Sequence, residues 1–407
     1  MARARKTISV DDLWQFERVG ALALSPDGAQ AVCTLQSFSM EENKGQTSLW
    51  LLSTFGGGPR RLTSCGEKDG QPAWSPTGER IAFLARREQH GAKDETQQLY
   101  VIAPDGGEAR RISDFAPGIE SFKWLPGGQR IAFVAWVWPE LRGSKAQAKR
   151  FKEFKERKES AYVTSEAQYR YWDHSLPMGR VPHLHLLDLA SGRIVDLFEG
   201  TDWELSRAEP DAHCFDVSPD GQRIVFAHDP GAEKRLDNCR ALAEIELRTR
   251  RVATVAHDKA WDLSAPRYSP DGARIAVFER ELRLRDNDYR YRLIVLPADG
   301  GEHRVVADAG DIILRRDQWA PTGASIDRPP SWSPDSSSLA YLTLRENHVE
   351  LWRVSAQGGV YEDPEKDEKF AETDVLRDLD RASDRIKVVG DDGASTDITR
   401  PLDWLIG

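Results

Sequence analysis

The chain has 407 residues, 40% of them hydrophobic, and a formal net charge of −10 at pH 7. That length supplies enough apolar material for a large core. The acidic balance argues against nucleic acid as a general partner, because phosphate binding needs a basic face. No apolar run follows the basic residues at the N-terminus, and none approaches the ~18 residues of a membrane span. The sequence therefore predicts a cytoplasmic protein without a secretory signal or membrane segment.

The four cysteines are scattered, and no two of them form a CxxC pair. In a cytoplasmic protein this pattern predicts reduced thiols and argues against a metal site built on cysteine.

A turn motif recurs along the chain after residues 1–20, which we expect to form an N-terminal helix and lead-in. Each copy has an apolar residue, usually Ser, then Pro, a small polar residue and generally Gly. Proline presets φ at the second position and glycine closes the turn. The six copies are Leu24–Gly28, Trp74–Gly78, Trp124–Gly128, Val217–Gly221, Tyr268–Gly272 and Trp332–Ser336.

Short β-prone runs follow each turn at regular intervals. In the second unit these are Arg80–Phe83, Leu99–Ile102 and, after a Gly-rich turn, Arg110–Ser113. In three units, the glycine of the recurring turn motif and the glycine of the later Gly-rich turn are 29 residues apart. In three pairs of successive units, the glycines of the recurring turn motif are 50 or 51 residues apart. Four strands in ~40–50 residues is the period of a propeller blade. The sequence thus predicts an all-β fold, a β-propeller of four-stranded blades over residues 21–360, with six recognisable repeats.

The third unit is 35 residues longer than the others between its second and third strands, and the inserted segment covers roughly residues 139–180. Its central part, Lys145–Glu159, is predicted to be an amphipathic helix with Phe151 and Phe154 on one side. Eight Lys or Arg and three Glu between Arg142 and Glu159 make it a basic patch on an acidic chain. We favour a solvated helix on the propeller rim. The alternative is a lid or docking element over one end of the channel.

The repeat fades after Val354. Residues 361–407 begin with a highly charged stretch typical of a linker or marginal helix. Two later runs, Arg385–Val389 and Thr396–Thr399, are candidates for two strands of an incomplete seventh blade.

Several segments resemble the start of bacterial acylaminoacyl-peptidase-like members of the prolyl oligopeptidase family. These are Val10–Trp14, Arg18–Gly20, Met40–Gly45, Tyr169–His174 and Gly179–Leu184. The resemblance covers about residues 7–358. The SPDG and DGG turns are shared with other propellers, including TolB-like ones.

The resemblance implies a seven-bladed propeller followed by an α/β-hydrolase domain with a G-x-S-x-G nucleophile elbow. The two nearest matches, Gly323–Asp327 and Gly393–Asp397, both lack the final glycine. We therefore assign no catalytic residue, no cofactor and no metal ligand, and expect the chain to be inactive alone. By resemblance, it gates peptide substrates through its channel for a hydrolase domain absent from this sequence, in cis or in trans. Truncation or a split reading frame would explain that absence.

Three local features have a functional and a structural interpretation. Glu41 and Glu42 offer charges that could pair with a peptide amino terminus, as paired glutamates do in dipeptidyl-peptidase relatives, but they match no motif and a solvated loop is the simpler interpretation. His183 and His185 alternate along a strand and face one way, yet no Asp, Glu or Cys partner for a metal is identifiable. Trp74, Trp124 and Trp332 occupy equivalent positions, which favours packing between blades over ligand stacking.

Two other function classes stay open. One is a free-standing, TolB-like propeller that binds protein partners on its rim or through its channel. The other is a propeller enzyme with a metal or acid pair in the channel, for which the sequence shows no convergent set at repeating positions. A peptidase propeller without its hydrolase would expose an apolar face and tend to self-associate.

Overall fold

The computed structural model describes residues 9, 11–64, 68–89, 91–159, 161–171, 174–175, 178–208, 210–232, 234–235, 238–282, 291–309, 329–345, 348–358, 387–389 and 395–397. The two near matches to the nucleophile elbow lie outside these residues, wholly or in part. So does the charged stretch that begins the predicted tail. No helix in the part that the structure describes has the length and hydrophobicity to cross a bilayer.

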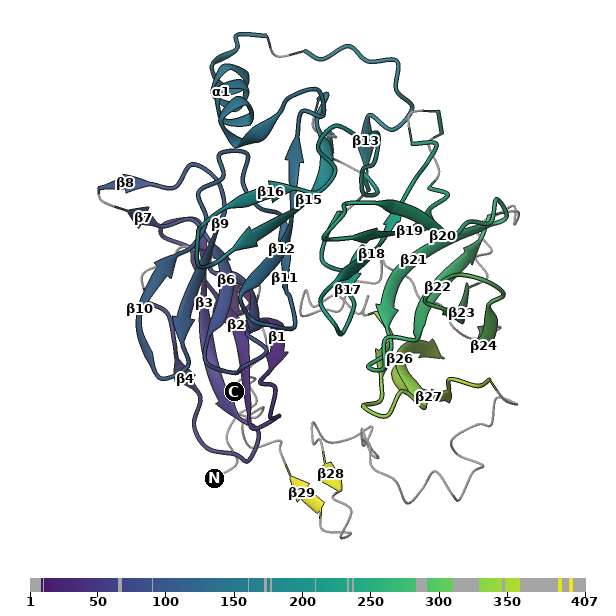
Figure 1. Ribbon diagram of the computed structural model, residues 1–407. Helices are drawn as coiled ribbons and strands as arrows, with labels where there is room; N and C mark the ends of the chain where they lie inside the picture. The colour runs from purple at the N-terminus through teal and green to yellow at the C-terminus, as the bar shows by residue number, and fades with distance from the viewer. Residues whose placement is uncertain are drawn as a thin grey trace.

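Antiparallel sheets follow one another along an arc, from β1–β4 at one end to β25–β27 at the other (Figure 1). The predicted β-propeller is confirmed, because five of these sheets are four-stranded meanders and the described part of the sixth has three strands. We number them blades I to VI. The two candidate strands of a further blade are also present as a hairpin, β28 (Lys387–Val389) and β29 (Ser395–Asp397).

The blades have the following strands. Blade I comprises β1 (Arg18–Leu24), β2 (Gln30–Ser39), β3 (Lys44–Ser53) and β4 (Arg60–Arg61). Blade II comprises β5 (Gly70–Trp74), β6 (Ile81–Ala85), β9 (Gln98–Ala103) and β10 (Gly106–Arg111). Blade III comprises β11 (Ser121–Trp124), β12 (Arg130–Val137), β15 (Val181–Asp188) and β16 (Ile194–Asp196).

The second half of the arc is built in the same way. Blade IV comprises β17 (Phe215–Val217), β18 (Arg223–His228), β19 (Ala241–Glu246) and β20 (Val252–Ala256). Blade V comprises β21 (Trp261–Tyr268), β22 (Arg274–Glu281), β23 (Tyr291–Pro297) and β24 (Arg304–Ala309). Blade VI comprises β25 (Ser331–Trp332), β26 (Ser338–Arg345) and β27 (His348–Ser355).

Short elements decorate this frame. They are the 3-10 helix η1 (Asp11–Trp14), the hairpins β7 (Glu88–Gln89) with β8 (Ala92–Lys93) and β13 (Arg170–Tyr171) with β14 (His174–Ser175), and the helix α1 (Gly143–Glu156). Of the predicted N-terminal helix and lead-in, residues 1–8 and 10 lie outside the described residues, and the described part contains η1 and the start of β1.

The predicted turns share one hydrogen-bonding pattern. In blade IV, Ser218 Oγ donates to Asp220 Oδ1 at 2.5 Å and accepts from Arg223 N at 2.9 Å. Asp220 Oδ1 also accepts from Gln222 N at 3.0 Å. Because these donors stabilise the carboxylate, the pKa of Asp220 is lowered, first of all by the Ser218 hydrogen bond. The recurring Ser and Asp thus close the turn internally, as Asx-type chemistry requires.

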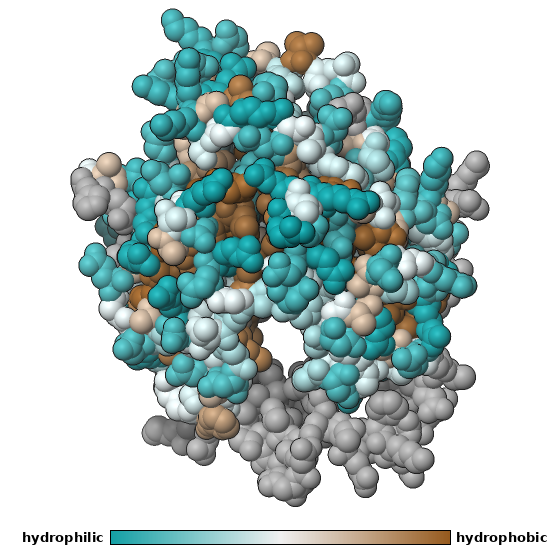
Figure 2. All heavy atoms as spheres, viewed as in Figure 1, coloured by the Kyte–Doolittle hydropathy of each residue, from teal (hydrophilic) through white to brown (hydrophobic). Residues whose placement is uncertain are grey.

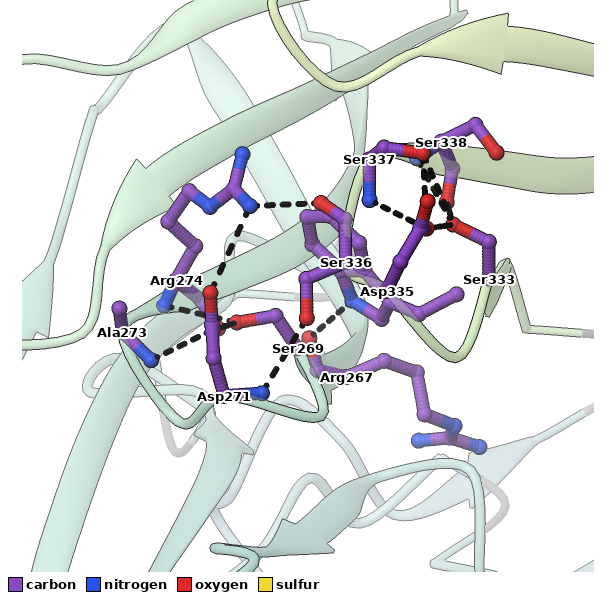
Figure 3. Close-up of polar contacts among 11 residues, drawn as sticks. Arg267, Ser269, Asp271, Ala273, Arg274, Ser333, Asp335, Ser336, Ser337 and Ser338 are labelled. Carbon is purple, nitrogen blue, oxygen red and sulfur yellow. Dashed lines mark hydrogen bonds and ion pairs between the residues drawn. The ribbon is translucent and has the colours of Figure 1, made fainter.

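The turns of neighbouring blades also pack on each other. Gly221 has φ +67°, and a Cβ placed there would lie 3.5 Å from Pro126 of the preceding blade's turn. Glycine therefore serves both the left-handed backbone and the close approach. Where blade VI has Ser336 instead, at φ +61°, its hydroxyl accepts from Asp271 N at 3.2 Å and its carbonyl accepts from Arg274 Nη2 at 2.6 Å (Figure 3).

The repeated tryptophans join consecutive blades. Each indole N–H donates to a carbonyl of the preceding blade's first strand: Trp74 to Ala23 at 3.1 Å, Trp124 to Ala73 at 3.2 Å and Trp332 to Arg267 at 3.0 Å. The interpretation of these residues as packing between blades is therefore confirmed. Each ring buries apolar area and adds a hydrogen bond to a backbone carbonyl of the neighbouring blade.

Trp124→Phe is expected to destabilise the protein by about 1–2 kcal/mol, because it removes the indole hydrogen bond to the Ala73 carbonyl and opens a small gap. The measurement is the free energy of unfolding in urea. Trp14, which is 39% exposed, provides the matched control. Trp14→Phe should change stability by less than ~0.5 kcal/mol, and equal effects of the two substitutions would contradict the assigned role of the indole.

Candidate functional site

The first strand of each blade lies at the inner end of its sheet. First strands of neighbouring blades contact one another, as β1 does β5, β5 does β11, and β17 does β21. They border the space between the two halves of the arc, which Figure 2 shows as an opening in the molecule. One position on this inner wall recurs in every blade, directly before the apolar residue that starts the turn. Its occupants are Ala23, Ala73, Lys123, Asp216, Arg267 and Ser331.

Three consecutive blades place charged residues at this position. Lys123 Nζ, from blade III, lies 2.8 Å from Asp216 Oδ1 and donates to the carbonyl of Phe215 at 2.7 Å, both in blade IV. The other oxygen of Asp216 accepts from Tyr268 N of blade V at 2.9 Å. Arg267 Nη1, also from blade V, reaches the same Phe215 carbonyl at 3.4 Å. We call Lys123, Asp216 and Arg267 the inner-wall cluster.

The position of the inner-wall cluster has a structural cause. At the junction of blades III and IV the anchor residue is Val217, which has no side-chain donor, so the indole bond that Trp74, Trp124 and Trp332 make at three other junctions cannot form. Lys123 reaches forward instead and bonds to the next blade directly. The sequence contains the signal for these residues at a fixed place in the repeat, but sequence reasoning looked there only for a convergent set of His, Asp or Glu. It therefore did not single out Lys123, Asp216 and Arg267.

Burial and neighbouring charges shift both cations. The pKa of Lys123 falls to about 8, first because of burial and second because of Arg267, while Asp216 opposes the shift. Burial also lowers the pKa of Arg267. The side chains of Lys123 and Asp216 still keep about a fifth of their area accessible, 21% and 19%. The inner-wall cluster therefore keeps charged groups partly accessible to solvent on the inner strands.

The second group of polar residues lies at the outer side of blade III. His183 and His185 of β15 share one face, as predicted, and Asp196 of the adjacent strand β16 faces them. His183 Nδ1 lies 2.9 Å from Asp196 Oδ2, and His185 Nε2 lies 3.8 Å from the same oxygen. The expectation that these histidines have no acidic partner was wrong, because antiparallel pairing of β15 with β16 brings in a residue 11 positions beyond His185.

A metal is not supported at this place. Among the described residues, no group of three or more His, Cys, Asp or Glu is arranged to hold one. His185 is instead part of an aromatic stack, with its ring centroid 4.9 Å from those of both Phe133 and Phe115. Its pKa falls to about 4, mainly through burial, so the ring is neutral at pH 7.

The insert helix α1 covers this outer region. It contacts β16, the outermost strand of blade III, and Lys155 forms an ion pair at 3.0 Å with Glu95 of blade II. Gln147 is buried and bonds to both the N–H and the carbonyl of Trp138. Phe154 packs edge-on against the Trp138 ring at 5.5 Å. The helix therefore lies on the propeller rim, as we favoured, with basic residues on its exposed side.

The remaining candidate is the glutamate pair. Glu41 and Glu42 lie in the exposed turn between β2 and β3, where Glu42 N donates to Ser39 Oγ at 3.2 Å. This position agrees with a solvated loop. Cys33, Cys214 and Cys239 are buried free thiols.

The chain has curated relatives among peptidases. It is 25% identical over 356 residues to dipeptidyl-peptidase 5 of Porphyromonas gingivalis, an alignment that covers 84% of this chain and 47% of the relative. It is 26% identical to dipeptidyl-peptidase 5 of Porphyromonas endodontalis, over 64% of this chain and 36% of that protein. The chain resembles the propeller portion of prolyl oligopeptidase family peptidases. It spans less than half the length of these two relatives.

Solved structures agree on the fold. The acylaminoacyl peptidase of Pyrococcus horikoshii superposes with a TM-score of 0.58 at 14% identity, covering 92% of this chain and 49% of that one. No family model matches the sequence.

His185 should make stability depend on pH. Its pKa is near 6.5 when unfolded and about 4 when folded. Between these values the unfolded chain binds a proton that the native state excludes, so the free energy of unfolding falls as pH falls from 6.5 toward 4. From the shift, this residue contributes a loss of about 2 kcal/mol between pH 7.5 and pH 5. Asp196, Glu199 and His183 are the charged or titratable neighbours.

The measurement is urea unfolding at both pH values for the wild type and His185→Phe, which keeps a ring between Phe115 and Phe133. The variant should lose less stability on acidification by about that amount. An identical loss in both proteins would contradict the assignment.

Proposed function

We propose that this chain is the substrate-gating propeller of a prolyl-oligopeptidase-family serine peptidase that acts on peptides. In this proposal the Ser, Asp and His of catalysis belong to an α/β-hydrolase domain outside these 407 residues, joined in cis or supplied in trans. The observation that carries the proposal is the similarity to dipeptidyl-peptidase 5 along 84% of the chain. The propeller fold supports it.

The gating mechanism is steric and electrostatic. A channel bounded by the rigid inner strands admits an extended peptide and excludes a folded domain by size. At the recurring inner-wall position, three blades have the small residues Ala23, Ala73 and Ser331. The other three blades have the charged residues of the inner-wall cluster. A passing peptide therefore meets charge from blades III to V, where partial desolvation strengthens electrostatic interactions.

The chain alone should have no serine-hydrolase chemistry. We expect no covalent labelling by a fluorophosphonate probe and no turnover of peptide or ester substrates, with an active serine hydrolase as the positive control. Sequencing ~1,000 bases past codon 407, the length of a further domain of ordinary size, should reveal a G-x-S-x-G elbow. Labelling of the chain would contradict the proposal. An unrelated gene at that place would exclude a hydrolase domain in cis and would favour a free-standing binding propeller.

The channel should bind extended peptides selectively. Fluorescence anisotropy with a labelled linear peptide is expected to show binding, whereas the same sequence held inside a folded host protein should not bind. Lys123→Gln leaves the carboxylate of Asp216 facing the channel without its partner, so acidic peptides should bind several-fold more weakly. Lys145→Gln, on the exposed side of α1, is the matched control and should have no effect. Equal binding of folded and linear forms would refute size selection.

A further inference from the structure

A small cavity of about 150 Å³ lies between α1 and the outer strands of blade III. Four parts of the chain form it: Phe115 in the segment between β10 and β11, the start of α1 with Gly143 and Ser144, the β15–β16 region, and Arg250 from the turn between β19 and β20 of blade IV. It is separate from the inner-wall cluster, none of whose residues lines it. Residues far apart in the sequence thus create one polar chamber at the junction of two blades.

The buried part of this cavity offers hydrogen-bond acceptors. His185 is 2% exposed, and its Nδ1 lies 3.2 Å from the carbonyl of His183, which can only accept, so Nδ1 carries the proton. Nε2 is then an unprotonated acceptor, whose nearest polar neighbour is Asp196 Oδ2 at 3.8 Å. Two acceptors at that distance do not bond to each other. An N–H donor placed between them would satisfy both.

A second carboxylate stands beside them. Glu199 lines the cavity and accepts from Gly143 N at 2.8 Å through Oε2, while its Oε1 forms no hydrogen bond with the described residues. Asp196 already receives His183 Nδ1 and Phe198 N, which hold its carboxylate in place. The hydrogen-bond acceptors of the cavity are therefore held in place before any ligand enters, which lowers the entropic cost of binding.

The rim of the cavity carries the opposite charge. Arg193 and Arg250 both line it, both are exposed, and neither guanidinium forms an ion pair or hydrogen bond with a described residue. Arg250 has φ +58°, and its N–H donates to the carbonyl of Glu246 at 2.7 Å, so the turn that carries it is constrained. Guanidinium groups suit carboxylates because their N–H donors match the two oxygens.

We propose that this cavity binds a free α-amino acid, with its ammonium group against His185, Asp196 and Glu199 and its carboxylate against Arg193 and Arg250. The separation of acceptors in the interior from cations at the rim matches a zwitterion. A volume of about 150 Å³ is well below the ~300–1,000 Å³ of pockets for drug-sized ligands, which excludes a longer peptide. The inference rests on the cavity alone and does not depend on the proposed function.

The test is isothermal titration of the full chain with a panel of free α-amino acids, each compared with its N-acetyl and its amide derivative. We expect at least one amino acid to bind at a ratio of one per chain. Acetylation removes the ammonium and amidation removes the carboxylate, so each derivative should bind about tenfold more weakly or worse. Equal affinity of the derivatives would overturn the proposal, as would no binding up to about 10 mM.

Rim variants locate the site without disturbing the core. Arg193→Gln and Arg250→Gln should each weaken binding of the amino acid about tenfold and leave binding of its amide unchanged. The matched control is Arg248→Gln, whose side chain is 81% exposed in the same turn and pairs with Glu246. It should bind like the wild type. Binding insensitive to both rim substitutions, or a divalent metal ion bound in place of the amino acid, would overturn the assignment.

Discussion

Each blade has two faces to bury, and this constraint governs the rest of the molecule. Every residue of β6 is buried, which requires a neighbouring sheet on each side. One isolated four-stranded sheet cannot satisfy this need, so stability depends on contacts between successive blades. The indole–carbonyl bonds and the packing of glycine on proline set the spacing and the angle of those contacts. Apolar burial supplies most of the free energy of packing between the blades. The polar links determine how neighbouring blades align with each other.

The inner wall shows what happens when one such link is missing. Between blades III and IV the anchor position holds Val217 in place of tryptophan, and an ion pair with a backbone bond connects the blades instead. Charged side chains at this place remain partly accessible to solvent, unlike an indole. A substitution in the structural repeat thus also changes the chemistry of the channel, so structural and functional roles fall on the same residues.

The insert has an analogous double effect. Gln147 and Phe154 fasten α1 to Trp138 at the end of β12, while Lys155 reaches blade II. This attachment keeps the helix at the outer rim and away from the inner strands. It also covers the region of His185 and Asp196, where burial keeps the imidazole neutral. A helix added to a propeller in this way creates a chamber without altering the blades.

The amino-acid sequence by itself determined the blades, because turn chemistry and strand length act over a few residues and recur at a constant spacing. The turn at Val217–Gly221, the insert after Val137 and the linking role of Trp74 follow from that local pattern. The tertiary structure alone decided which distant side chains meet. Asp196 joins His183 through the register of β15 and β16, and Arg250 reaches the cavity of blade III from blade IV. Such contacts depend on strand register and on the angle between sheets, which no spacing along a single strand encodes.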